Sequence, residues 1–261
     1  MSLTLGSGPL GRHPGYSNYT IESPAHKILF QEDPRRLRAV IGDSVVFDTT
    51  GAQLLHETGI RPVAYVPFGD FDASLLERSQ TTTHCPFKGD ASYWSLRVGD
   101  DLREDAVWAY EEPLEPALWL RGFAALAADR ADHWMVEDER VAGHLRDPYH
   151  RVDVHQSSRA VRITAGDDLI AQSARPVMVF ETAIRPRAYV ARRDIVAGHL
   201  APSPTRTTCP YKGDATYWHV HADGRKFPDA AWSYELPSAE AMKIAGHVCF
   251  AAEGITTVQE G

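Results

Sequence analysis

The sequence predicts a mostly β protein made of two tandem antiparallel domains, and two observations carry this prediction. The string CPFKGDASYW at residues 85–94 returns as CPYKGDATYW at residues 209–218. Short strand-like runs separated by Gly, Asp and Pro dominate the chain, which is the pattern of an all-β protein. Strands do not alternate regularly with helices, and no glycine-rich nucleotide motif is present, so a Rossmann-type fold is not expected.

The repeat extends well beyond this string. Cys85 and Cys209 are 124 positions apart, and about 36 of the 99 residues from 24 to 122 are identical to the residue 124 positions later. A period of this length fits a whole small domain rather than a solenoid unit. We therefore expect a flexible N-terminal arm over 1–20, a first domain over 21–140 and a second over 141–261. The polar segment EDERVAGHLRDP is the expected linker.

Turn and cap residues delimit the elements. Gly42-Asp43 and Gly166-Asp167 are typical of hairpin turns, and the CPFKG segment at 85–89 is typical of a turn because Pro and Gly favour turn geometry. Two short helices are expected, over 71–78 and over 116–122, the latter ending at Gly122. The predicted strands of the first domain are 37–41, 44–48, 54–58, 64–67, 91–98 and 106–110.

Alternation along the strands separates core from candidate site. Trp94 shares a face with Leu96, so we expect Trp94 in the core and Tyr93 on the other face. Trp108 and Tyr110 share one face of another strand. Two such aromatics can form a wall for a flat ligand, or they can simply belong to the core.

The charged residues of the repeat allow functional and structural interpretations. Lys88 could lower the pKa of the Cys85 thiol, bind an anion or act as a nucleophile. No histidine accompanies the motif in both copies, so a structural cysteine is the simpler interpretation. Glu57 precedes Arg61 by four residues; the two could form an ion pair or a solvated edge, or the carboxylate could serve acid/base chemistry in a pocket.

Composition limits the classes of partner. The formal net charge is −8, which disfavours nucleic acid. No apolar run approaches the ~20 residues of a membrane span, and the N-terminus does not resemble a signal peptide. Three cysteines without dense spacing indicate no disulfide scaffold, so a cytoplasmic location is expected. His26 and His150 recur in both copies but stand isolated, and we expect neither a metal nor a cofactor.

Three motifs together carry a resemblance to a known family. T-x-C-P-[FY]-K-G-D-A-[ST]-Y-W, W-x-Y-E-x-P and E-T-x-I-R-P-x-A-Y-V resemble the bacterial and fungal domain of unknown function 427, over nearly the whole of both repeats. The resemblance implies a β-tent-like fold, similar to that of methionine sulfoxide reductase B. Many such domains hold zinc through two C-x-x-C pairs. Here Lys88 and Lys212 stand where a second cysteine would be, which implies that the zinc is lost.

The resemblance also ranks candidate site residues, although the family supplies no activity to carry over. The family pattern maps onto Glu57, Arg61, Tyr65, Thr83, Cys85, Lys88, Tyr93, Trp108 and Tyr110, and onto Glu181, Arg185, Tyr189, Thr207, Cys209, Lys212, Tyr217, Trp232 and Tyr234. A fold rarely needs so many repeated charged and phenolic groups, because buried charge is costly unless it is paired.

The expected function is therefore small-molecule binding in an aromatic-walled polar pocket of each domain, with an enzymatic reaction left open. The alternative is a non-catalytic structural or protein-interaction module, whose twin domains form a pseudo-dimer within one chain and leave a monomer open. A third hypothesis is redox sensing through Cys85 and Cys209. Phe68-Gly69 corresponds to Arg192-Arg193, which suggests that the two sites differ.

Overall fold

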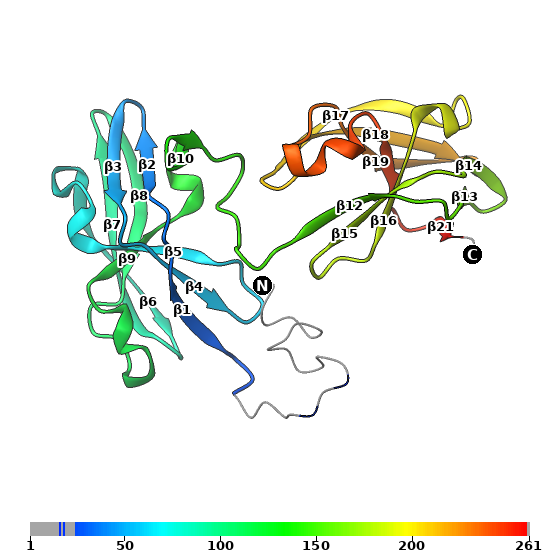
Figure 1. Cartoon of the computed structure of the whole chain (residues 1–261). Coiled ribbons are helices and arrows are strands. Elements are labelled where there is room, and N and C mark those ends of the chain that lie inside the picture. Colours follow the sequence, from blue (N-terminus) through cyan, green and yellow to red (C-terminus); the bar gives the residue numbers. More distant parts are fainter. Residues whose placement is uncertain (1–15, 17, 19–23, 260–261) are drawn as a thin grey trace. The chain divides into compact units, whose positions relative to one another are not determined.

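The computed structural model describes residues 16, 18 and 24–259 of the chain. The arm predicted over 1–20 lies almost wholly outside these residues. The chain divides into two compact units between Asp147 and Pro148 (Figure 1). Within the described residues, no helix is long and apolar enough to cross a membrane.

The first unit contains two antiparallel sheets. The larger sheet has the strand order β1 (Ile28–Glu32), β4 (Gln53–Glu57), β5 (Val63–Pro67), β9 (Phe123–Leu126), β8 (Asp101–Ala109), β7 (Gly89–Val98) and β6 (Leu76–Cys85). The smaller sheet has the order β11 (Glu139–Arg140), β10 (His133–Val136), β2 (Leu37–Ile41) and β3 (Ser44–Thr49). The predicted hairpin at Gly42-Asp43 is confirmed, since Ile41 pairs with Ser44 across it.

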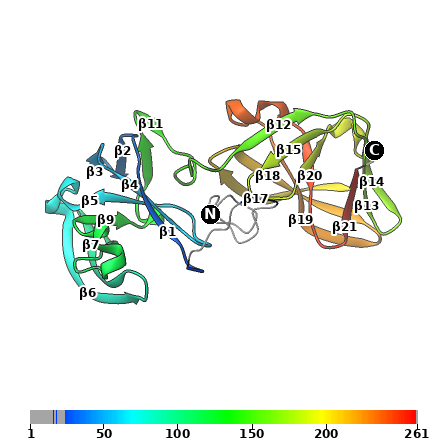
Figure 2. The ribbon, with the colours of Figure 1, turned by 60° about the horizontal axis from the view of Figure 1, so that its bottom comes forward.

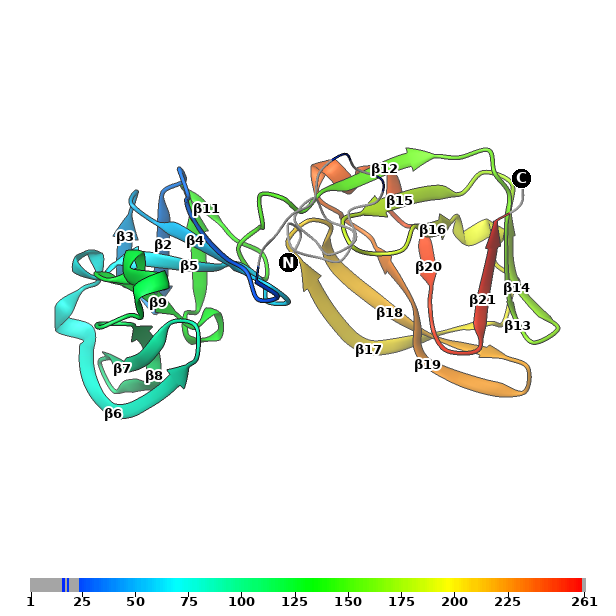
Figure 3. The ribbon, with the colours of Figure 1, turned by 90° about the horizontal axis from the view of Figure 1, so that it is seen from below.

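The second unit repeats this plan. Its larger sheet has the order β12 (Val152–Gln156), β15 (Val177–Glu181), β16 (Arg187–Val190), β20 (Val248–Phe250), β19 (Arg225–Tyr234), β18 (Gly213–Ala222) and β17 (Leu200–Cys209). Its smaller sheet has the order β14 (Asp168–Ser173), β13 (Val161–Ala165) and β21 (Ile255–Gln259). Figure 2 shows β12 beside β15, and Figure 3 shows β13, β14 and β21 side by side. The mostly β, antiparallel, two-domain prediction is confirmed.

In the residues that the structure describes, helical structure is confined to short 3-10 turns. These are η1 (Phe68–Asp70), η2 (Ala73–Leu75), η3 (Glu115–Leu120), η4 (Ala128–Arg130), η5 (Arg192–Asp194) and η6 (Ala239–Ile244). Of the helix predicted over 71–78, only the single 3-10 turn η2 forms. Asp72 caps a single turn by accepting a hydrogen bond from the Ser74 backbone N–H, and from Leu76 onward the chain pairs with β7 as a strand. The second predicted helix is confirmed as η3, and Gly122 follows it with φ +84°.

Both faces of each larger sheet are covered. On one face, Trp94, Leu96 and their neighbours pack against the smaller sheet, as the alternation predicts for Trp94. The opposite face carries a separate buried group that we call the outer cluster. In the first unit its buried members are Leu55, Tyr65, Ala91, Tyr110, Ala117, Leu120 and Ala125. Ala117 and Leu120 come from η3, so this short helix covers that face.

The segment expected as a linker packs on the first unit. Its residues Glu139–Arg140 form β11, the Val141 N–H donates to the Trp134 carbonyl, and Val141 and Leu145 pack against the core. The end of the first unit thus helps to shape its surface.

Candidate functional site

Most of the candidate residues meet on the outer face of the larger sheet. Tyr65 and Tyr110 belong to the outer cluster of the first unit, and Cys85, Tyr93 and Trp108 pack against it. Strand alternation produces this arrangement, because each of these residues shares its face with an outer-cluster residue two positions away or on the neighbouring strand. The second unit gathers Tyr189, Cys209, Tyr217, Trp232 and Tyr234 in the same way.

A buried ion pair lies beside this cluster. The Lys88 Nζ donates to Glu57 Oε2 at 2.5 Å, and the two side chains are only 9% and 6% exposed. Lys88 ends the turn after β6: its backbone N–H donates to the Cys85 carbonyl, and its own carbonyl accepts from the Leu114 N–H. The next residue, Gly89, has φ +103°, which a side chain would disfavour. Turn and backbone together fix the lysine against Glu57.

A histidine completes this charged group. The His26 Nε2 lies 3.1 Å from Glu57 Oε1, and the His26 ring stacks on Phe87 with centroids 4.1 Å apart. A carboxylate accepts hydrogen bonds, so Nε2 carries the proton and Glu57 fixes the ring orientation. We call His26, Glu57 and Lys88 the charged triad of the first unit.

The second unit has a matching triad. Glu181 binds Lys212 through Oε2, and its Oε1 lies 3.0 Å from His150 Nε2. The Tyr211 ring lies 4.4 Å from the His150 ring, in the place of Phe87. Burial alone would raise the pKa of Glu181, but hydrogen bonds and charge from His150 and Lys212 lower it below its usual value. The triad carboxylate is therefore held ionised.

The tyrosines are packed rather than open to a ligand. Tyr65 is 1% and Tyr110 6% exposed, and burial raises the pKa of both phenols above the usual value. The Trp108 Nε1 donates to the Tyr65 Oη at 3.1 Å, and Tyr93 shares a hydrogen bond with Thr83. These aromatics act as a hydrogen-bonded layer of the fold.

The cysteines differ in exposure. Cys85 and Cys209 are half-buried at the ends of β6 and β17. Cys249 is buried, and burial raises its pKa to about 12. Cys249 is therefore a thiol, not a thiolate, at neutral pH, and it behaves as an apolar core residue.

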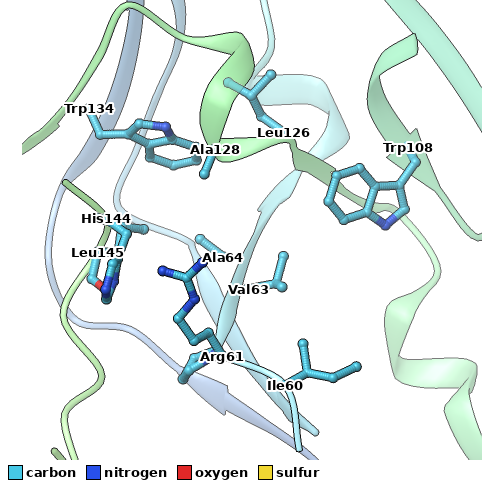
Figure 4. Close-up of a pocket in the computed structure, with 11 residues that line it drawn as sticks. Ile60, Arg61, Val63, Ala64, Trp108, Leu126, Ala128, Trp134, His144 and Leu145 are labelled. Atoms are coloured by element: carbon cyan, nitrogen blue, oxygen red, sulfur yellow. The ribbon is translucent and has the colours of Figure 1, made fainter. Parts of the chain in front are cut away.

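Arg61 lies apart from the triad and lines a cavity of about 260 Å³ in the first unit. Glu57 contacts Lys88 and His26 rather than Arg61. Figure 4 shows Trp108 and Trp134 on opposite sides of the cavity, with Val63 and the Arg61 guanidinium between them. Within the described residues, this guanidinium makes no ion pair or hydrogen bond. The cavity therefore combines apolar walls with an uncompensated positive charge.

The corresponding region of the second unit is built differently. Arg187 stands in the place of Val63, and its guanidinium lies 5.6 Å from the centre of the Trp232 ring. Thr257, which is exposed, takes the place of Trp134, because Trp134 pairs with Ala39 and Thr257 pairs with Ile163, the counterpart of Ala39. Arg185 keeps the position of Arg61, but one aromatic wall is covered by the protein's own cation and the other is absent.

Trp94 and Trp218 each lie beside an arginine, but the arginine comes from a different segment in each unit. Arg78 lies 5.1 Å from the Trp94 ring centre and binds Glu111. In the second unit Arg192 lies 4.7 Å from the Trp218 ring. It binds Glu235, the counterpart of Glu111. Arg78 corresponds in sequence to Pro202, and Arg192 corresponds to Phe68. The same Arg–Trp–Glu arrangement is thus reached from different segments.

His26 and His150 are partners of the glutamates, a role that was not predicted from the sequence. The available signal was the Pro-x-His string, which both repeats keep at the same offset as Glu57 and Glu181. Within residues 16, 18 and 24–259, no group of three or more His, Cys, Asp or Glu side chains is placed to hold a metal ion.

Comparison with known proteins agrees with the repeat. A family model described as a domain of unknown function (DUF427) matches the chain twice, over residues 29–137 and 153–261. No curated protein matches the sequence.

Proposed function

The chain belongs to the DUF427 family in two copies, and on this basis we propose that it is a small-molecule-binding protein whose site is the Arg61 cavity of the first unit. The observation that carries this proposal is the unpaired guanidinium beside two tryptophans. Apolar and aromatic walls with a few convergent polar groups are the usual composition of ligand pockets. The cavity volume of about 260 Å³ suits a small ligand.

The charged triads support a different role. Lys88 already neutralises Glu57 in a buried pair, so binding a ligand anion there would first require this pair to break. Both units build the triad in the same way, with the same spacing of His, Glu and Lys. The triad is therefore better explained as a structural network that fixes the hairpin between β6 and β7.

A thermal-shift screen against a metabolite library tests the proposal. A ligand that binds only the folded protein stabilises it by about 2.7 kcal/mol at 100 times its Kd. We expect a stabilising compound whose effect is lost in Arg61→Ala. The matched control is Arg185→Ala, the same change in the second unit, which should keep the full shift.

Two outcomes would overturn the proposal. One is a screen in which no compound stabilises the protein. The other is a stabilising compound whose effect is the same in Arg61→Ala and in the unmodified chain, because that compound would bind elsewhere. Arg61 is exposed, and within the described part of the chain its guanidinium makes no ion pair or hydrogen bond, so its loss should not itself destabilise the unit.

A protein-interaction module is the second candidate function, and one surface favours it. Leu114, Leu118 and Trp119 on and before η3 are 40%, 47% and 37% exposed, and nearby Phe87 is 44% exposed. Exposed apolar side chains grouped in this way are common at interaction sites. Replacing Leu118 and Trp119 by Ser should then abolish a partner's binding while the shift caused by a small ligand persists.

A further inference from the structure

The chemistry of the Arg61 cavity narrows the ligand class. We infer that the ligand is a planar organic carboxylate and that only the first unit of each chain takes it. This inference rests on the proposed function, because it assumes that the Arg61 cavity is the binding site. It adds the charge and shape of the ligand and the number of sites.

The charge follows from Arg61. A guanidinium is always protonated and presents a planar fork of donors that matches a carboxylate. Within the described residues, no acidic side chain pairs with this one. A ligand carboxylate would therefore gain a charge-assisted interaction without displacing an internal partner. A single guanidinium suits one negative charge better than a phosphate dianion, which is usually met by several donors.

The shape follows from the walls. Trp108 and Trp134 lie on opposite sides of the cavity, and Leu126 and Val63 supply apolar surface between them (Figure 4). The Trp108 Nε1 is already engaged by Tyr65, so Trp108 offers its ring rather than a donor. Tryptophan rings gain most contact from flat partners that stack or meet them edge to face. A ligand with one aromatic ring or two fused rings suits a cavity of about 260 Å³.

The number of sites follows from the second unit. The Arg187 guanidinium lies over the face of Trp232, which corresponds to Trp108. An internal cation–π contact thus takes the place that a ligand ring occupies in the first unit. Thr257 in place of Trp134 removes the opposite wall. The first unit is therefore the single site of each chain.

Isothermal titration with charge-matched probes tests the class. The probes are benzoate and indole-3-acetate, each compared with its neutral amide. We expect one site per chain and at least tenfold tighter binding of an acid than of its amide. Arg61→Ala should remove this preference, and Arg185→Ala should leave it unchanged. Val63→Arg, which copies the residue of the second unit, should abolish binding.

The outcomes separate this inference from the proposed function. Equal binding of acid and amide overturns the carboxylate but keeps the cavity as a site. If only neutral or cationic compounds stabilise the protein in the screen, the carboxylate is likewise overturned and the cavity is kept as a site. Two sites per chain, or full binding by Val63→Arg with its fold intact by hydrogen exchange, overturns the single-site assignment. If no compound binds at all, the proposed function itself fails.

Discussion

The two units keep one group of residues alike and let another diverge. The charged triads match in partners and geometry: His26, Glu57 and Lys88 in one unit are repeated as His150, Glu181 and Lys212 in the other. The surroundings of the tryptophans do not match, because Trp108 borders a cavity whereas Trp232 lies under Arg187. The matching triads are therefore best explained as residues that the fold requires. Difference between the repeats marks where one unit has acquired its own role.

The largest effect is expected from breaking a triad. Lys88→Met leaves the Glu57 carboxylate buried with only His26 beside it, and removing one partner of a buried pair typically costs about 3–5 kcal/mol. We expect a loss near the lower end for the first unit, and an equal loss in the second unit from Lys212→Met. Peptide-level hydrogen exchange of the full chain measures the two units separately.

The control for this experiment removes both charges. The double variant Glu57→Leu/Lys88→Met should recover most of the stability, because replacing a buried pair by apolar side chains is often neutral. If Lys88→Met leaves protection of β4 and β6 unchanged, the triad is not structural. In that case the identity of the two triads would need an explanation other than folding stability.

Alkaline pH should lower the folding stability of both units, and over the same range of pH. Burial raises the pKa of Tyr65 and Tyr110 in one unit and of Tyr189 and Tyr234 in the other. A raised pKa gives stability that is full below the unfolded value of about 10 and is lost as pH rises above it. We expect tyrosinate absorbance to rise in two phases, the second coinciding with unfolding. A single phase near pH 10 with the fold intact would contradict this expectation.

Acidic pH should lower the stability of the second unit through its triad, by less than the triad substitutions do. The pKa of Glu181 is lowered, so its contribution to stability is full above the unfolded value of about 4.3 and is lost as pH falls through the folded value. Urea denaturation between pH 7 and pH 3 should show the second unit losing stability below about pH 4. Glu181→Gln should flatten this dependence, and an unchanged slope in that variant would assign it to other groups.

The smallest effect is expected from the arginines on Trp94 and Trp218. Arg78 and Arg192 are 57% and 41% exposed, and exposed ion pairs contribute little because water and salt screen them. Arg78→Ala and Arg192→Ala should each change the unfolding midpoint only slightly, and less at high salt. A loss comparable to that of Lys88→Met would place these arginines with the triads.

The sequence was most informative where a rule is local. Glycine-containing turns placed the Gly42-Asp43 hairpin, and period-two alternation placed Trp94 in the core and Tyr93 on the other face. The helix predicted over 71–78 is reduced to the turn η2, because its residues from Leu76 onward lie in a strand that pairs with β7. A partner on a distant strand outweighed local propensity there.

The site was harder to predict because its partners are distant in sequence. Arg61 lies four residues from Glu57, but a turn after β4 separates them, and the true partners, His26 and Lys88, are each 31 residues away. The packing of the tyrosines in the outer cluster was also not predicted. Repeated tyrosines suggested a pocket wall, yet the phenols fill the space under η3. Composition alone does not distinguish an aromatic layer from an aromatic cavity.

The arginine that lies over the tryptophan comes from β6 in the first unit (Arg78) and from η5 in the second (Arg192). This difference limits recombination between the repeats. Exchanging β6 for β17 alone would carry Arg78 into a unit that already holds Arg192, and would leave Trp94 beside Phe68 and Pro with no cation. One chimera would place two like charges at one indole, and the other would place none. The smallest segment that can be exchanged without this conflict runs from Phe68 to Arg78, because it carries both alternative arginine positions together. Sequence shuffling between the copies should therefore succeed only when its crossovers fall outside that block.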